Sequence, residues 1–244
     1  MIEVRNISKA FNERPVLQDV STFFEEGKTN LIIGRSGSGK TVLMKTMIGL
    51  LVPDQGDVIY DGQSFHKINK KEKDSIRQEI GMLFQGGALF DSMTVAENVL
   101  FPLQMFSSQT KEEMHKRVEF CLERVGLKHA VNLNPSELSG GMKKRVAIAR
   151  AIANKPKYLF CDEPNSGLDP QTSNMIDQLI HEITKEYNMT TIINTHDMNS
   201  VASIGEKIIF IHEGKLWWEG SSNEIRNANN KELAEFTFGL GLMN

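Results

Sequence analysis

The sequence predicts an α/β fold. Short apolar runs of strand character occur at 31–33, 80–84, 158–161 and 190–195, and segments with helical spacing or helix-capping residues separate them. A glycine-rich loop at 34–41 connects the first of these strands to an apolar helix. In open α/β sheets the residues that follow the strands are the usual ligand positions, so the ends of these strands are the first places to search for a site.

Composition limits the class of protein. The chain has 244 residues, of which 40% are hydrophobic, so it can bury a sizeable core. Cys121 and Cys161 lie far apart and outside any metal-binding spacing, so we expect buried thiols in a reducing compartment. The net charge of -3 gives no basic footprint and disfavours nucleic acid as a partner. Because there is no signal-peptide core and no apolar run near the roughly 18 residues that span a bilayer, we expect the chain itself to be cytosolic.

The chain opens with two expected strands, at 2–7 and 16–24. They are joined by residues 8–15, and Gly27 turns the chain into the next strand. Phe11 lies in this connection. The sequence leaves two interpretations of this ring open, a platform on which adenine stacks or an ordinary core or loop aromatic.

The loop after the third strand carries the strongest motif. It matches the phosphate-binding pattern G-x-x-x-x-G-K-[ST], in which glycines let consecutive backbone N–H groups turn toward one point. The lysine adds a full charge, the helix that follows points its positive end at the phosphates, and the threonine hydroxyl can ligate Mg²⁺. The sequence therefore predicts a nucleotide site made by Gly34, Arg35, Ser36, Gly37, Ser38, Gly39, Lys40, Thr41 and Val42.

The chain then alternates between short turns and solvated structure. A strand is expected at 57–60, between turns at 53–56 and 61–62. The charged stretch 67–79 mixes both signs and predicts a solvated helix. The strand at 80–84 ends at Gln85.

Beyond this strand the pattern becomes helical. Thr94 and Glu97 form a capping box for a helix expected to run through Val99, with Pro102 near its end. A second helix, at 111–125, carries its apolar residues on one face, which indicates packing against a core.

A second group of motifs begins with Leu138-Ser139-Gly140-Gly141-Met142. It precedes a helix expected from about Lys143 to Ala153, so Ser139 and the two glycines lie at a helix N-terminus, where free N–H groups bind anions. On its own, Ser139 could equally be a simple helix cap.

Polar residues follow the last two core strands. Asp162 is placed to hold Mg²⁺, and Glu163 to polarise an attacking water. A lone histidine is more often structural, but the position of His196 directly after a core strand favours a functional role. A hairpin at 207–218 and two short helical segments end the chain.

Taken together, these motifs resemble the nucleotide-binding subunit of an ABC transporter over essentially the whole chain. They include the phosphate loop, Gln85 as the Q-loop glutamine, 138–142 as the signature, 166–169 as the D-loop and His196 as the switch histidine. The resemblance implies ATP and Mg²⁺ as cofactors, Glu163, His196 and Gln85 as catalytic residues, and Thr41, Gln85 and Asp162 as metal ligands. Two positions depart from the family pattern, since Phe11 replaces a tyrosine and Met142 replaces a glutamine.

The resemblance also implies the architecture. It predicts one P-loop NTPase domain over 1–240, with a RecA-like core at about 1–85 and 157–220 and an antiparallel β subdomain. A helical subdomain is expected at about 86–156 and a C-terminal tail at about 221–244.

The partners expected from the resemblance begin with a second copy of the chain. In a head-to-tail homodimer, Ser139, Gly140 and Gly141 of one copy would complete the ATP site of the other. An integral-membrane permease is expected to bind segment 86–103, where Leu89 and Phe90 either floor a cleft for a coupling helix or simply pack the helical subdomain.

Three stretches, 86–103, 138–145 and 195–198, are similar to the ATPases of MCE-type phospholipid transport systems. This similarity implies lipid transport at the cytoplasmic face of the inner membrane, with an MCE-type lipid-binding protein and a small regulatory subunit as further partners. An importer ATPase for amino acids or other small solutes is the main alternative. A non-transport ABC ATPase is disfavoured, because the chain has neither a long coiled coil nor a second cassette.

Overall fold

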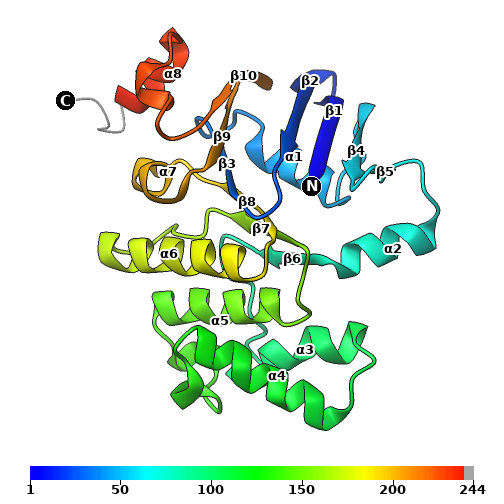
Figure 1. The fold of residues 1–244 in the computed structure, drawn as a ribbon, viewed down its shortest axis with the longest axis vertical. Helices are drawn as coiled ribbons and strands as arrows, with labels where there is room; N and C mark the ends of the chain where they lie inside the picture. The colour runs from blue at the N-terminus through cyan, green and yellow to red at the C-terminus, as the bar shows by residue number, and fades with distance from the viewer. Residues whose placement is uncertain (239–244) are drawn as a thin grey trace.

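Two β-sheets with helices around them make up the fold in the computed structural model, which describes residues 1–238 (Figure 1). The first sheet is antiparallel, in the order β2-β1-β4-β5, and the second has six strands in the order β10-β9-β3-β8-β7-β6. In the second sheet the strands from β9 to β6 run parallel, and β10 is antiparallel. The strands are β1 (Ile2–Phe11), β2 (Arg14–Phe24), β3 (Thr29–Ile33), β4 (Gln55–Tyr60), β5 (Gln63–Ser64), β6 (Ile80–Leu83), β7 (Tyr158–Asp162), β8 (Thr190–Asn194), β9 (Lys207–His212) and β10 (Lys215–Gly220).

Helices cover both faces of the parallel sheet, which confirms the predicted α/β class. On one face, α1 packs between the two sheets, and its residues Leu43 and Met47 share a buried core with residues of both sheets. On the other face, α5, α6 and α7 bury residues such as Ile180 in the larger core. The helices are α1 (Lys40–Met47), α2 (Lys70–Gln78), α3 (Val95–Phe106), α4 (Lys111–Arg124), α5 (Gly140–Ile152), α6 (Pro170–Glu186), α7 (Met198–Ile204) and α8 (Lys231–Phe238).

The first hairpin corrects a prediction. Residues 8–15 were expected as a connection, but β1 continues through Phe11 and only Asn12 and Glu13 form the turn. Both turn residues have positive φ (48° and 65°). A two-residue turn of this kind matches the right-handed twist of the flanking strands, so β1 and β2 stay paired up to the turn. Strand β4 begins at Gln55, which pairs with Ser8 of β1, so the turn expected at 53–56 is shorter than predicted.

The helical segment also differs in its boundaries. The capping box of Thr94 and Glu97 is confirmed, but α3 runs past Val99 to Phe106 and contains Pro102. A proline removes one helical hydrogen bond, but the buried side chains of α3, such as Val99 and Leu103, pack against the core and outweigh that loss. Helix α5 begins at Gly140 rather than Lys143, because the Ser139 hydroxyl accepts from the N–H of Met142 and caps the helix there.

Other predictions hold in outline. Helix α2 occupies the middle of the charged stretch, and α4 buries Val118, Cys121 and Leu122 as expected from its spacing. Cys121 and Cys161 are free and buried, and burial raises the pKa of the Cys121 thiol to about 11. Helices α6 and α7 were not predicted.

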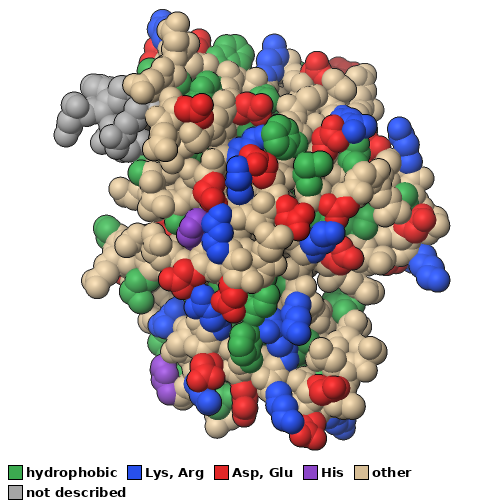
Figure 2. All heavy atoms as spheres, in the orientation of Figure 1, with side chains coloured by type: hydrophobic (Ala, Val, Ile, Leu, Met, Phe, Trp, Pro, Cys, Tyr) green, Lys and Arg blue, Asp and Glu red, His purple; other side chains and the backbone are tan. Residues whose placement is uncertain are grey.

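Helices α3, α4 and α5 lie together beyond the β6 side of the fold (Figure 1). The division of the chain into a RecA-like core and a helical subdomain stays a prediction, and the expected tail at 221–244 extends past the described residues. Between residues 1 and 238, the structure contains no helix with the length and apolar character to cross a bilayer. On the face shown in Figure 2, basic and acidic side chains are interspersed.

Candidate active site

The candidate site lies at the edge of the sheet where the parallel strands end. Strand β3 leads into the loop that starts at Gly34, and β6 ends two residues before Gln85. Strand β7 ends at Asp162 and is followed by Glu163, and β8 is followed by Thr195 and His196. Since β3, β8, β7 and β6 are neighbours and parallel, their carboxyl ends meet at one edge. The fold thus gathers residues that are far apart in the sequence.

Close packing requires glycine in the phosphate loop. Gly34 and Gly39 have positive φ (150° and 109°), and a Cβ at Gly34 would lie 2.2 Å from the carbonyl oxygen of Ile211. At Gly39 a Cβ would lie 2.9 Å from the carbonyl oxygen of Val16. The loop can therefore keep this shape against β9 and β2 only without side chains at these positions.

Lys40 is buried within the curve of the loop. Its Nζ donates to the carbonyl oxygens of Gly34 (2.8 Å) and Arg35 (3.1 Å). Burial lowers the pKa of Lys40, and the charges of Glu163 and Asp162 oppose this shift. The ammonium is thus held beside the two acids predicted for metal binding and catalysis.

Ser38 provides a test of whether a phosphate fits the loop. Its Oγ is buried and has no hydrogen-bond partner within residues 1–238. A buried hydroxyl without a partner costs free energy, whereas a phosphate oxygen would accept its proton. Because the charged Lys40 is buried in the same loop, the loop fits an anionic phosphate.

Glu163 lies at the centre of a hydrogen-bonded cluster. The amide of Gln85 donates from Nε2 to Oε2 of Glu163 at 2.8 Å, and Nδ1 of His196 lies 3.2 Å from Oε1. The φ of Glu163 is 48°, which is uncommon for a residue with a side chain. Backbone strain of this kind concentrates at functional sites, and here it accompanies the three predicted catalytic side chains.

The residues predicted to hold Mg²⁺ lie at the same edge. Asp162 accepts a hydrogen bond from Asn194 Nδ2 at 3.0 Å, which fixes one carboxylate oxygen, and the side chain of Thr41 is exposed at the start of α1. Across residues 1–238 no cluster of three or more His, Cys, Asp or Glu side chains could hold a metal by itself. A single carboxylate with a hydroxyl fits Mg²⁺, which usually completes its shell with water and substrate phosphates.

A cavity of about 420 Å³ connects these residues. It is lined by Arg35, Ser36, Lys40, Glu163 and His196. Two further lining residues, Glu235 and Phe236, come from α8 and were not predicted. The Phe236 ring packs 5.3 Å from that of Phe210 on β9, so tertiary contacts bring α8 here and no motif in the sequence could have indicated it.

The predicted signature residues and Phe11 lie apart from this cavity. Ser139 and Gly140 are exposed at the start of α5, and a Cβ at Gly141 would lie 2.7 Å from the Thr172 methyl at the start of α6. Phe11 is 42% exposed at the tip of the first hairpin, with Lys9 Nζ 5.5 Å from its ring centroid. Within one chain, none of them joins the lining of the Lys40 cavity.

The segment after Gln85 is held by the helix that follows the signature. Lys144 Nζ donates to the carbonyl oxygen of Gln85, and Arg150 donates to those of Gly87 (2.7 Å) and Ala88 (2.8 Å). A movement of α5 therefore acts directly on the backbone beside Gln85.

Next to this segment lies a groove of about 450 Å³. Phe90 is 41% exposed in it and packs against Phe101 with ring centroids 4.8 Å apart, while Leu89 is partly buried against the core. Each of the two interpretations therefore applies to one residue. Leu89 packs against the core, whereas Phe90 lines a surface groove. The groove is lined by Arg77, Gln78, Ile80, Gly81, Met82, Phe84, Ala88, Phe90, Phe101, Pro102, Phe106, Arg150, Ala151 and Asn154.

Known proteins resemble this chain closely. The ABC transporter family matches residues 17–166. The chain is 36% identical over 239 residues to the intermembrane phospholipid transport system ATP-binding protein MlaF of Haemophilus influenzae, covering 98% of this chain and 90% of that protein. It is 39% identical over 233 residues to the methionine import ATP-binding protein MetN of Clostridioides difficile, covering 96% and 72%. A dimeric post-hydrolysis structure of the ATP-binding cassette MJ0796 bound to ADP and Pi has a TM-score of 0.82 and 34% identity, covering 91% of this chain and 99% of that one.

Proposed function

Because the chain belongs to the ABC transporter family and is an ATPase coupled to transport, we propose that it powers phospholipid transport at the inner membrane. The observation that carries this proposal is the resemblance to MlaF, which extends over 98% of this chain and 90% of that protein. Lys144, in the segment 138–145 that resembles MCE-type ATPases, donates to the carbonyl oxygen of Gln85, the residue directly before segment 86–103. These two segments would thus form one continuous surface toward a membrane partner.

The proposed chemistry uses the residues at the edge of the sheet. Lys40 and the loop N–H groups bind the phosphates of ATP, and Thr41, Gln85 and Asp162 hold Mg²⁺, which when bound neutralises phosphate charge. Glu163 orients and deprotonates the attacking water, and His196 and Gln85 hold its carboxylate through the contacts at 3.2 and 2.8 Å. Phe11 stacks on adenine from the tip of its hairpin.

The proposed assembly is a head-to-tail dimer. Ser139 and Gly140 are exposed and Gly141 is half-buried at the N-terminus of α5, where N–H groups and the helix dipole suit an anion. Facing the loop of a second copy, they would stabilise charge on the far side of the γ-phosphate. In this arrangement hydrolysis requires closure of two subunits, which couples it to work on the membrane partner.

The proposed partner at the groove is a permease at the cytoplasmic face of the inner membrane, so that the ATPase is peripheral there. The exposed ring of Phe90 supports this, because an apolar groove with charged edges accepts an amphipathic helix. An MCE-type lipid-binding protein and a small regulatory subunit complete the proposed system.

The experiment that tests the cargo is reconstitution. The ATPase is assembled with its permease in vesicles, and ATP-dependent transfer of fluorescent phospholipid is measured. We expect transfer to require ATP and to be lost in Phe90→Asp, which places a charge in the groove, while ATP binding stays intact. Phe120→Asp, an exposed aromatic on α4 outside the groove, serves as the matched control.

An importer ATPase is the second candidate, because MetN of Clostridioides difficile shares 39% identity with this chain. Hydrolysis in the reconstituted complex then distinguishes the two. Stimulation by an amino acid and its binding protein, without any response to lipid, would replace the phospholipid proposal with this one.

A further inference from the structure

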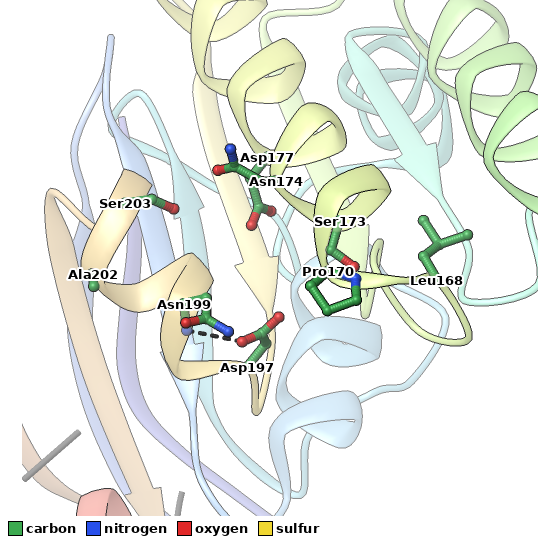
Figure 3. Close-up of a pocket in the computed structure, with 9 residues that line it drawn as sticks. All are labelled: Leu168, Pro170, Ser173, Asn174, Asp177, Asp197, Asn199, Ala202 and Ser203. Atoms are coloured by element: carbon green, nitrogen blue, oxygen red, sulfur yellow. Dashed lines mark hydrogen bonds between the residues drawn. The ribbon is translucent and has the colours of Figure 1, made fainter. Parts of the chain in front are cut away.

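The first half of α6 and the helix α7 border a second cavity, of about 560 Å³ (Figure 3). Asp177 projects from α6 toward α7 there, and Asp197 caps the start of α7 through a 2.8 Å bond to the N–H of Asn199. Asp177 is only 2% exposed. A carboxylate buried to this degree is costly and is normally retained for a purpose.

Asp177 holds two side chains that come from different segments. Asn165 Nδ2 donates to Oδ1 at 2.8 Å, and Ser200 Oγ donates to Oδ2 at 2.7 Å. Asn165 Nδ2 also lies 3.1 Å from Ser200 Oγ, which closes a triangle. The Oδ1 atom of Asn165 is buried and has no partner within residues 1–238, so its amide is fixed through Nδ2 alone.

These two segments carry Glu163 and His196. Asn165 follows Glu163 in the turn after β7, and its neighbour Ser166 lies 3.4 Å from the Gln85 amide. Ser200 belongs to the first turn of α7, directly after His196 and the cap at Asp197. The Asp177 carboxylate therefore links the two backbone segments that carry Glu163 and His196, whose side chains lie 3.2 Å apart.

We propose that Asp177 is a positioning residue for ATP hydrolysis, which holds the Glu163 turn and the His196 turn together through Asn165 and Ser200. The inference rests on the proposed roles of Glu163 and His196. Asp177 does not touch the Lys40 cavity, so it affects the geometry of the hydrolytic cluster and not the binding of ATP. Displacement of reacting groups by a fraction of an ångström is enough to slow catalysis severalfold.

The charge of Asp177 matters to this role. Burial raises the pKa of Asp177 to about 6, and the charge of Asp197 on the facing turn adds to the shift although Ser200 and Asn165 oppose it. The Cys161 thiol on β7 also faces Asp177, and its own pKa is raised mainly by burial. Above this pH both carboxylate oxygens accept hydrogen bonds; below it, one of them carries a proton and the pair of acceptors is lost.

The test compares the wild-type chain with Asp177→Asn, which keeps the shape of the side chain and removes the charge. With the full-length ATPase and Mg-ATP, kcat and KM are measured between about pH 5 and pH 9. We expect kcat to fall about tenfold at pH 8 with KM unchanged. The ratio of wild-type to variant kcat should shrink toward 1 as the pH falls through about 6, where wild-type Asp177 itself becomes neutral.

Two controls separate positioning from packing. Asn174→Ala, an exposed residue of α6 that lines the same cavity, should leave kcat at its wild-type value. In a double-mutant cycle, the double variant Asp177→Asn/Asn165→Ala should be little slower than either single variant, because both changes break the same link. Thermal melting at pH 8 should show that Asp177→Asn is at least as stable as wild type, since the variant buries no charge.

Several outcomes overturn the inference. The first is an unchanged kcat in Asp177→Asn, and the second is that the effects of Asp177→Asn and Asn165→Ala on kcat are additive. The third is a loss of kcat in Asp177→Asn that does not depend on pH and is accompanied by a lower melting temperature. A failure of the underlying function would be recognised separately, because Glu163→Gln would then hydrolyse ATP at the normal rate whatever Asp177→Asn does.

Discussion

The phosphate loop and the signature segment, which we propose both contact phosphate, are built in opposite ways. In the loop, Lys40 is buried and bonded to two loop carbonyls, and Gly34 lies directly against β9. At the signature, Ser139 and Gly140 are exposed at the start of α5, and the hydroxyl of Ser139 does no more than cap its own helix. The first surface is complete inside one chain, whereas the second points outward.

On the proposed roles, this difference separates ATP binding from turnover. A group that is buried with its charge partly balanced by Asp162 and Glu163 can bind phosphate without help. Exposed hydrogen-bond donors at the start of a helix stabilise an anion only weakly in water. They become effective when a second surface covers them and excludes the water. We therefore expect changes in the loop to remove binding and changes at the signature to remove turnover alone.

The largest effect is expected from Lys40→Ala. Loss of a buried ammonium leaves phosphate charge uncompensated, so ATP affinity should fall about 10²- to 10³-fold and turnover should become undetectable. Isothermal titration with ATP measures the affinity. Lys45→Ala removes an exposed lysine from the same helix and should bind ATP normally. An unchanged affinity in Lys40→Ala would mean that the phosphates lie elsewhere.

Glu163→Gln tests the proposed catalytic base, which follows β7. The amide keeps the contacts to Gln85 and His196 but cannot act as a base, so hydrolysis should slow roughly 10²- to 10⁴-fold while ATP still binds. The variant should also accumulate as an ATP-bound dimer, visible by gel filtration. Glu182→Gln, an exposed acid on α6, is the matched control. Normal turnover in Glu163→Gln would move the role of base to another residue.

Ser139→Arg probes the signature. Its bulk and charge would block donors meant for the partner's nucleotide, so ATP should bind normally and turnover should fall about 10²-fold. A mixture with Lys40→Ala provides the decisive measurement. In a mixed dimer one composite site retains both its loop and its signature, so activity should exceed that of either parent. If the mixture is no more active than its components, the two surfaces do not meet across a dimer.

The smallest effect concerns stability at the signature. A Cβ at Gly141 would lie 2.7 Å from Thr172 Cγ2, whereas one at Gly140 would lie 3.5 Å from Leu168 Cδ2, an ordinary contact. Because both positions gain similar helix propensity, Gly141→Ala should be less stable than Gly140→Ala by about 1 kcal/mol. Urea unfolding measures this difference. Equal stabilities would indicate that α6 moves easily away from the signature.

Local motifs indicated most of the candidate site. The phosphate loop, Gln85, Asp162, Glu163 and His196 each follow a strand that the sequence reveals by its apolar run, and the structure places all of them at one edge of the sheet. Family membership, the ATPase activity and the α/β fold are confirmed as well. The roles of individual residues stay predictions until the variants above are measured.

The errors occurred where tertiary packing outweighs local preference. Pro102 suggested the end of a helix, but the burial of Val99 and Leu103 carries α3 onward to Phe106. The first hairpin turned out longer because Asn12 and Glu13 adopt positive φ, which composition alone does not reveal.

The sequence by itself determined the chemistry of this protein, because phosphate binding depends on a contiguous loop whose glycines, lysine and threonine are adjacent in the chain. Only the tertiary structure decided what surrounds that chemistry. It brought α8 to the Lys40 cavity and joined Asn165 and Ser200 through Asp177. Such contacts join residues from separate elements, and their burial and hydrogen bonding depend on how sheets and helices pack, which no local pattern specifies.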